Sequence, residues 1–181
     1  MNTKDDNELV YEVLHGSISS FETLIDRYQK TIFNLMLRMA GDFETAKDLT
    51  QDVFVKGFEK LGSFDFKYRF FSWIYRIAVN EAINWSRKRP VPERLGKFDA
   101  ADPGNADTWS AEEKSRLLNR ELLKLDVDYR ALVLLKYYQG LSYEEISETT
   151  GISVKKVRSR LFIAREQLRK GLIANNFFEN D

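Results

Sequence analysis

The three prolines of this 181-residue chain all lie within one stretch, residues 90–113. The same stretch contains two glycines and a polar run, and six of its side chains are acidic. Proline interrupts helices, and such a composition is typical of a connecting segment. We therefore expect a flexible linker over 90–113 that joins a domain of residues 1–89 to a domain of residues 114–181.

On both sides of the linker, apolar residues recur at three- and four-residue steps, and no stretch alternates convincingly at period two. The chain is therefore predicted to be all-α, with two small helical domains. Cap and stop residues mark the helices expected in the first domain. Their expected limits are a capping box at 19–22 to Gly41, Asp42 to Gly62, and Phe70 to Arg89.

Composition excludes several classes of protein. Basic and acidic residues are balanced at 28 each and 43% of residues are hydrophobic, so the chain is not disordered. It has no cysteine, a single histidine (His15, expected at a helix C-terminus) and no glycine-rich phosphate loop, so we expect no enzyme activity, metal or cofactor. There is no apolar run long enough to span a membrane and no signal segment at the start, and we expect a cytoplasmic protein.

The charge is balanced overall but strongly separated along the chain. Residues 67–89 carry six basic and one acidic group, and residues 153–170 carry seven and one. Residues 1–66 have twelve acidic and seven basic groups. Basic blocks of this kind indicate contact with a polyanion.

One side of the third expected helix carries a mixed stripe of aromatic, amide and guanidinium side chains. Its members lie at offsets 0, 3, 7, 11 and 14: Trp73, Arg76, Asn80, Asn84 and Arg87. Single-stranded nucleic acid suits this stripe, because bases stack on aromatic rings and phosphates pair with arginine. The alternative is that Trp73 is a core residue and the others are solvated. The neighbouring aromatic and basic loop 64–69 favours the nucleic-acid interpretation.

Serine caps and a glycine stop predict a helix-turn-helix in the second domain, after a first helix that begins at a capping box at 110–113. Ser142 begins one helix, Gly151 ends it, and Ser153 caps a second helix from about Val154. This is the layout of a DNA-binding helix-turn-helix. The apolar face of the second helix is Val157, Leu161, Ala164 and Leu168. The opposite face is Lys155, Arg158, Ser159 and Phe162, which suits a major groove.

These segments resemble the extracytoplasmic-function sigma factors, the compact two-domain initiation subunits of bacterial RNA polymerase. The resemblance covers nearly the whole chain. In the first domain it rests on the motifs that begin at Phe21, Ala46 and Trp73, and in the second on those that begin at Gly140 and Val157. The helix-turn-helix alone is shared with many regulators, whereas the segment from Trp73 to Asn80 is much more specific.

The resemblance implies a transcription initiation factor that binds core RNA polymerase and directs it to promoter DNA, and it implies an anti-sigma partner. Residues expected to bind polymerase are Asp48, Gln51, Asp52 and Phe54. Residues expected to capture the melted minus-ten element are Phe64, Lys67, Arg69, Trp73, Arg76, Asn80, Asn84 and Arg87. Residues expected to read the duplex minus-thirty-five element are Lys155, Lys156, Arg158, Ser159, Arg160 and Phe162.

Two positions of the second domain depart from the family pattern. The recognition helix opens with Lys155 and Lys156 in place of a common Gly-Thr pair, and Ile163 stands where a basic residue is frequent. Promoter preference is therefore not transferred. The alternative function is a helix-turn-helix regulator that binds duplex DNA without polymerase, but such a protein would not need the stripe or the acidic linker.

Overall fold

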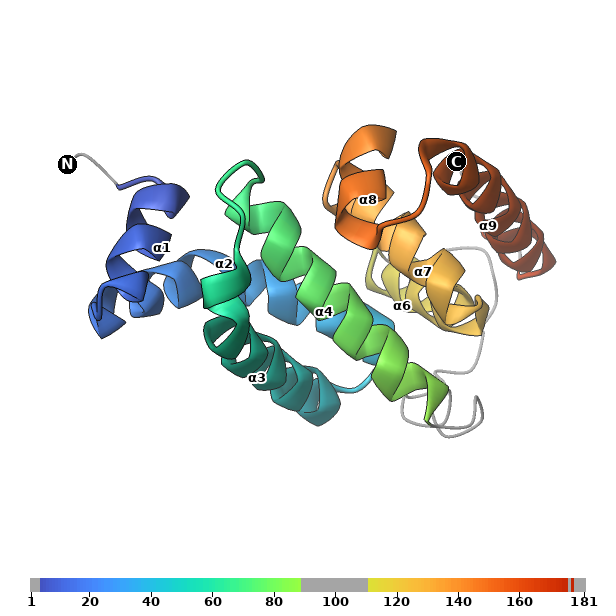
Figure 1. The fold of residues 1–181 in the computed structure, drawn as a ribbon. Coiled ribbons are helices and arrows are strands. Elements are labelled where there is room, and N and C mark those ends of the chain that lie inside the picture. The colour runs from blue at the N-terminus through green and yellow to red at the C-terminus, as the bar shows by residue number, and fades with distance from the viewer. Residues whose placement is uncertain (1–3, 89–110, 176, 178–181) are drawn as a thin grey trace.

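The computed structural model describes residues 4–88, 111–175 and 177, and every regular element within them is a helix (Figure 1). The linker at 90–110 and the expected Ser110 cap lie outside these residues. Helix α6 already begins within the stretch 90–113 that was predicted as linker. The elements are α1 (Asp6–Leu14), α2 (Ile18–Ala40), α3 (Phe43–Lys60), the 3₁₀ turn η1 (Leu61–Ser63), α4 (Phe70–Arg87), α6 (Ala111–Lys124), α7 (Val127–Val133), the π-helical η3 (Leu134–Tyr138), α8 (Tyr143–Thr150) and α9 (Val154–Ala174).

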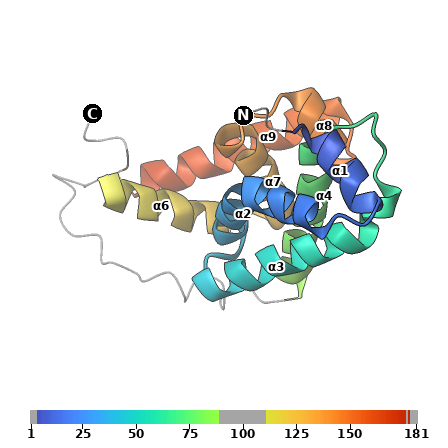
Figure 2. The ribbon, with the colours of Figure 1, turned by 90° about the vertical axis from the view of Figure 1, so that its left-hand side faces the viewer.

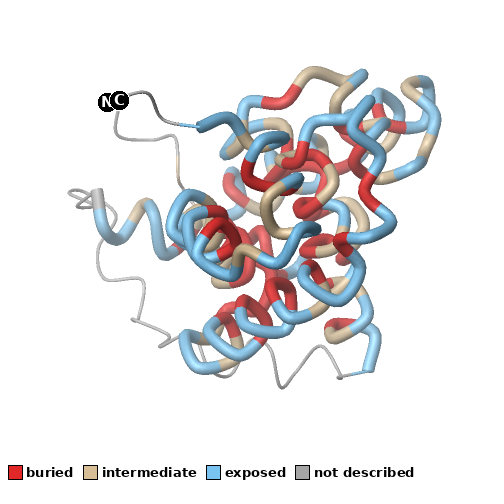
Figure 3. The backbone as a smooth tube through the Cα atoms, turned by 60° about the vertical axis from the view of Figure 1, so that its left-hand side comes forward, coloured by how far each residue is buried: buried red, intermediate tan, exposed pale blue. Residues whose placement is uncertain are grey.

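In the first domain, α2 packs against α3 and α4, and α1 lies along α2. The inward faces of these helices are aliphatic, and their side chains are almost completely hidden from solvent (Figure 3). Among the most deeply buried are Leu24, Ile32, Leu35, Met36, Met39, Val53 and Ile74. This burial is the main force that holds these amphipathic helices together.

The helix ends follow the local chemistry of the sequence. Gly41 ends α2 with a φ of +76°, a conformation that glycine adopts at little cost, and the Asp42 side chain caps α3 by accepting from the Thr45 backbone N–H at 3.0 Å. The predicted capping box at Ser19 is wrong, because α2 begins at Ile18 after Ser17. The Ser17 hydroxyl bonds to the Ser20 hydroxyl instead of a helix amide. His15 caps the C-terminus of α1, as expected.

Helices α3 and α4 approach each other closely at Gly57. A Cβ atom at this position would lie 2.8 Å from Cδ1 of Ile74, so the end of that buried side chain would have to shift. An ion pair between Lys56 and Glu81 links the same two helices. Both contacts hold α3 and α4 close together.

In the second domain, α6, α7 and α8 pack around α9. The helix-turn-helix is formed as predicted: the Ser142–Glu145 capping box starts α8, Gly151 ends it with a φ of +74°, and Ser153 caps α9. The fully buried Arg130 of α7 donates to the backbone carbonyls of Leu122, Leu123 and Leu125 at the end of α6. These bonds satisfy helix C-terminal carbonyls that otherwise lack partners.

The two domains pack directly on each other. Helix α4 lies against α7 and α8, and α2 lies against α6 and α7 (Figures 1 and 2). Their buried apolar side chains form one contiguous cluster. The contact was not expected from the sequence, which only predicted two domains and a linker.

Candidate nucleic-acid interfaces

The stripe on α4 has the phase that the sequence predicted. Arg76, Asn80, Asn84 and Arg87 are exposed, whereas Trp73 is half-buried. The Trp73 ring lies edge-on to Phe64 and tilted against Phe70, with centroid separations of 5.7 and 5.6 Å. Trp73 therefore supports the domain core with part of its surface and leaves the rest accessible.

The loop before α4 divides its aromatic residues between core and surface. Phe64 is only 7% exposed and packs against Phe66 and Phe70, so its burial corrects the prediction that it contacts DNA. Phe66 and Tyr68, which were not singled out, are exposed, as are the predicted Lys67 and Arg69. The sequence showed an aromatic loop, but only the packing decides which ring turns inward.

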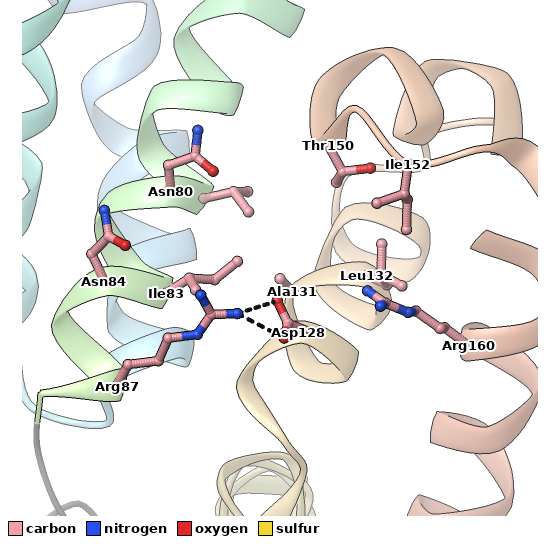
Figure 4. A pocket seen from close by; sticks show the side chains of 11 residues that line it. Asn80, Ile83, Asn84, Arg87, Asp128, Ala131, Leu132, Thr150, Ile152 and Arg160 are labelled. Atoms are coloured by element: carbon pink, nitrogen blue, oxygen red, sulfur yellow. Dashed lines mark hydrogen bonds and ion pairs between the residues drawn. The ribbon is translucent and has the colours of Figure 1, made fainter. Parts of the chain in front are cut away.

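A pocket of about 170 Å³ lies between the stripe and the second domain (Figure 4). Asn80, Asn84 and Arg87 line one side, and Asp128 and Arg160 line the other. A second hollow includes Trp73 and Arg76 of α4 and the turn between α8 and α9. At this turn, a Cβ added to Gly151 would lie 2.9 Å from the Arg76 guanidinium. The stripe therefore faces the second domain along its length.

Two carboxylates of the second domain pair with arginines that were predicted to contact DNA. Arg87 donates to Asp128 at 3.1 Å, and Arg69 donates to Glu145 at 3.2 Å. The pKa of Glu145 is lowered, mainly by a hydrogen bond from the Ser142 backbone N–H and to a lesser degree by the Arg69 charge. Both ion pairs are largely exposed, so each stabilises the contact between domains by only ~0–1 kcal/mol.

Other contacts between the domains lie away from the stripe. Arg130 donates through Nη1 to the Met39 carbonyl at the end of α2, at 2.5 Å. Arg38 donates to the Asn119 side chain at 2.8 Å, and its guanidinium lies 4.1 Å from the ring centroid of Tyr138. Burial raises the pKa of Tyr75, whose hydroxyl donates to Gln139 at 3.0 Å.

The predicted recognition face on α9 is open to solvent. Its exposed members are Lys155, Lys156, Arg158, Ser159 and Phe162. Arg158 lies over the Tyr143 ring at 5.2 Å and within 3.9 Å of the Glu144 carboxylate, contacts that the sequence did not indicate. Arg160 differs from the others, because it is half-buried and lines the pocket that faces α4.

The expected polymerase-binding face on α3 is also exposed at Asp48, Gln51 and Asp52. Phe54 is only 7% exposed, which corrects its assignment to this face: it is a core residue. Phe58, whose spacing from Phe54 also fits the apolar side of the helix, is half exposed, and Val55 is more exposed still. The exposed side of α3 therefore combines acidic and apolar groups.

Within residues 4–88 and 111–175, no cluster of three or more histidine, aspartate or glutamate side chains is arranged to hold a metal ion. None of the helices described in these ranges is long and apolar enough to cross a membrane.

Comparison with known families identifies both domains. Residues 24–90 match the model for sigma-70 region 2, and residues 115–168 match the model for sigma-70 region 4. The chain is 32% identical to the RNA polymerase sigma-H factor of Pseudomonas aeruginosa, over 95% of this chain and 96% of that one. It is 37% identical to the RNA polymerase sigma factor YlaC of Bacillus subtilis, over 84% and 92% of the two chains.

Solved structures share the fold. CnrH, in complex with the cytosolic domain of CnrY, matches 93% of this chain and 97% of its own at a TM-score of 0.72 and 25% identity. RpoE of Bartonella quintana, in complex with the anti-sigma factor NepR, matches 86% and 98% at a TM-score of 0.66 and 24% identity. From the 32% identity to SigW of Bacillus subtilis over 90% of this chain, together with both matched regions, it follows that the chain belongs to the extracytoplasmic-function family of RNA polymerase sigma factors.

Proposed function

We propose that this chain binds core RNA polymerase and directs it to specific promoters. The α4 stripe reads the melted minus-ten element, and the exposed face of α9 reads the duplex minus-thirty-five element. The chain acts by binding in the cytoplasm and performs no catalysis of its own.

The observation that carries this proposal is the presence of two chemically different nucleic-acid surfaces in one chain. The α4 stripe combines a half-buried tryptophan with exposed amides and arginines, which suits unstacked bases. The α9 face is a basic helix surface in a helix-turn-helix, which suits a major groove. A factor that only binds duplex DNA has no use for the first surface.

Run-off transcription with core polymerase on a pool of promoters tests the proposal. We expect the purified chain to direct initiation from a subset of the pool. If it fails to direct initiation from any promoter, the central proposal is wrong. Co-purification with core polymerase separates this function from the alternative of a helix-turn-helix regulator, which would bind duplex DNA and leave core polymerase in the flow-through.

The exposed acidic face of α3 is proposed to dock on polymerase. Asp52→Lys should weaken core binding by about tenfold, equivalent to ~1.4 kcal/mol, because it reverses a charge in the contact. Glu22→Lys is the matched control, since Glu22 is an exposed acidic residue on α2. Unchanged core affinity of the Asp52 variant in a fluorescence binding assay would show that the docking face lies elsewhere.

We also propose an anti-sigma partner. The structures of CnrH and Bartonella quintana RpoE, each with a bound partner, support this proposal. Exposed apolar side chains on both domains, including Ile18, Phe58 and Tyr137, offer surface for such a partner. Affinity capture from the native host with the tagged chain, followed by mass spectrometry, should recover a protein that blocks core binding.

A further inference from the structure

We infer that Tyr143 is a positioning residue for promoter recognition: its ring holds the guanidinium of Arg158 on the α9 face in an orientation from which it can donate to a base edge. This inference rests on the proposed function of the α9 face. It adds a residue of α8 that determines specificity without contacting a base itself.

Tyr143 and Arg158 meet because the turn of the helix-turn-helix brings α8 and α9 against each other. Tyr143 is the first residue of α8, directly after the Ser142 cap, and Arg158 lies in the second turn of α9. The two helices are in contact. The Cζ atom of Arg158 lies 5.2 Å from the centroid of the Tyr143 ring, within the range in which a guanidinium and an aromatic ring attract each other.

The Tyr143 ring is itself held in place. It is half-buried and packs against the buried apolar cluster. Lys136 lies 4.8 Å from the ring centroid and is anchored in turn, because it donates to the Leu141 carbonyl at 2.9 Å. A long exposed side chain samples many rotamers and loses this freedom when it binds. The ring reduces that loss for Arg158 by offering a fixed surface.

The contact with the ring leaves Arg158 able to bind DNA. A guanidinium attracted to the face of a ring keeps its N–H donors, which lie in its own plane, available for other partners. The Glu144 carboxylate lies 3.9 Å from Nη2 of Arg158, beyond hydrogen-bond distance. The two side chains are 63% and 64% exposed, so solvent screens this ion pair and the ring is the main support.

The lysines of the same face lack such support. Among the residues that the structure describes, no ion pair or ring contact is found for the side chains of Lys155 and Lys156. A flexible ammonium suits a phosphate, whereas a guanine edge requires two donors in a fixed relation. Arg158, which is proposed to read a base, therefore differs from the two lysines in having a fixed partner.

The test measures the base preference of the full chain. Duplexes with a randomised segment are bound at two salt concentrations, and the bound fraction is sequenced. Arg158→Ala identifies the position at which the preference for guanine depends on this arginine. Tyr143→Leu removes the ring but keeps an apolar side chain for the core, and Tyr143→Phe keeps the ring.

Tyr143→Leu should reduce the preference for guanine at the Arg158 position by about twofold to fivefold and leave the other positions unchanged. Tyr143→Phe should retain the native preference, because it keeps the aromatic face. In the Arg158→Ala background, Tyr143→Leu should cause no further loss at this position, since the ring then has no guanidinium to hold.

Two controls separate the ring from other effects. Tyr137→Leu removes an exposed tyrosine of the same domain and should change no preference. Glu144→Gln removes the carboxylate beside Arg158 and should also keep the preference, because the exposed ion pair is screened. A loss of preference with Glu144→Gln but not with Tyr143→Leu would assign the positioning to the carboxylate and overturn the inference.

An equal loss at every position with Tyr143→Leu would mean that the ring only supports the fold. Additive losses in the double variant would mean that the two residues act independently. Either result overturns the inference, as does an Arg158→Ala variant that alters no position. The proposed function is judged separately, because core polymerase binding and run-off transcription can succeed while Tyr143 proves to have no effect on base preference.

Discussion

The two proposed nucleic-acid surfaces lie on helices of similar length, 18 residues in α4 and 21 in α9, but they have different surroundings. The α9 face is open to solvent, although Arg160 lines the pocket that faces α4 and Arg158 contacts Tyr143 and Glu144 of α8. The α4 stripe also has exposed side chains, but these line two hollows whose other sides belong to the second domain. The comparison teaches that helix phase decides which residues share a face, whereas tertiary packing decides whether that face is available.

The largest expected effect is on the stability of the domain that carries α9, which Arg130 supports with most of its hydrogen bonds. Arg130→Met should destabilise the second domain by about 3 kcal/mol or more, because several buried carbonyls lose their donor. Hydrogen exchange with mass spectrometry should show faster exchange in α6 and α7, together with loss of duplex binding.

Arg169→Met is the matched control for this change, since Arg169 is exposed on α9 and pairs only along its own helix. It should alter stability by less than about 0.5 kcal/mol. An equal loss of stability in both variants would mean that the hydrogen bonds of Arg130 contribute no more to stability than an exposed side chain does.

The next effect is on the α4 stripe. Asn80→Ala should reduce open-complex formation roughly tenfold, or by ~1–2 kcal/mol, because a base captured from the melted strand loses its hydrogen bonds. Duplex binding through α9 should be retained. Permanganate footprinting measures melting, and Asn34→Ala on the exposed side of α2 is the control. Normal melting in the Asn80 variant would remove this residue from the proposed site.

Two residues on α9 should differ from each other. Arg158→Ala should cost ~1–3 kcal/mol and relax preference at one promoter position, because its planar guanidinium can donate twice to a guanine. Lys156→Ala should weaken all promoters alike and reduce the salt slope by about one, as a phosphate contact does. Binding to a promoter library at two salt concentrations measures both. A change of preference with Lys156→Ala but not with Arg158→Ala would show that the helix phase is misassigned.

The smallest effect is the pH dependence of the ion pair between Arg69 of the first domain and Glu145 of the second. The lowered pKa of Glu145 means that its cap and its ion pair with Arg69 are fully present above its unfolded pKa and are lost as pH falls through the folded value. NMR titration of the Glu145 carboxyl should show only a small upward pKa shift in Arg69→Ala, because the Ser142 backbone N–H still donates to the carboxylate in this variant. A return of the Glu145 pKa to its ordinary value in Arg69→Ala would make the interdomain ion pair the main cause.

Structural features that depend on a single helix were predicted well from the sequence. The all-α fold, the Asp42, Ser142 and Ser153 caps, and the exposed face of α9 all follow from local chemistry and a 3.6-residue period. The exception is the start of α2, where three serines at positions 17, 19 and 20 offered competing caps. Capping preferences alone allow more than one of these serines to begin the helix. In the structure Ser17 is the N-cap of α2, and α1 packs on this helix.

Features that depend on distant segments were not predictable. Phe64 belongs to an aromatic loop with an exposed neighbour, and only the assembled core shows that its ring turns inward. Arg130 resembles any surface arginine in the sequence, yet it is completely buried because carbonyls from α2 and α6 converge on it. The contact between the domains has no local signal, since its partners are up to 91 residues apart.

The close approach of α3 and α4 at Gly57 has a consequence for how such a protein can diversify. This glycine and the Lys56–Glu81 pair hold the two helices close together, so the outward surfaces of both are presented in a constant relation. Substitutions along the outer side of α4 are then expected to alter base preference without shifting the proposed docking face on α3. New promoter preferences can thus arise on an unchanged attachment to polymerase, if both proposed surfaces are correct.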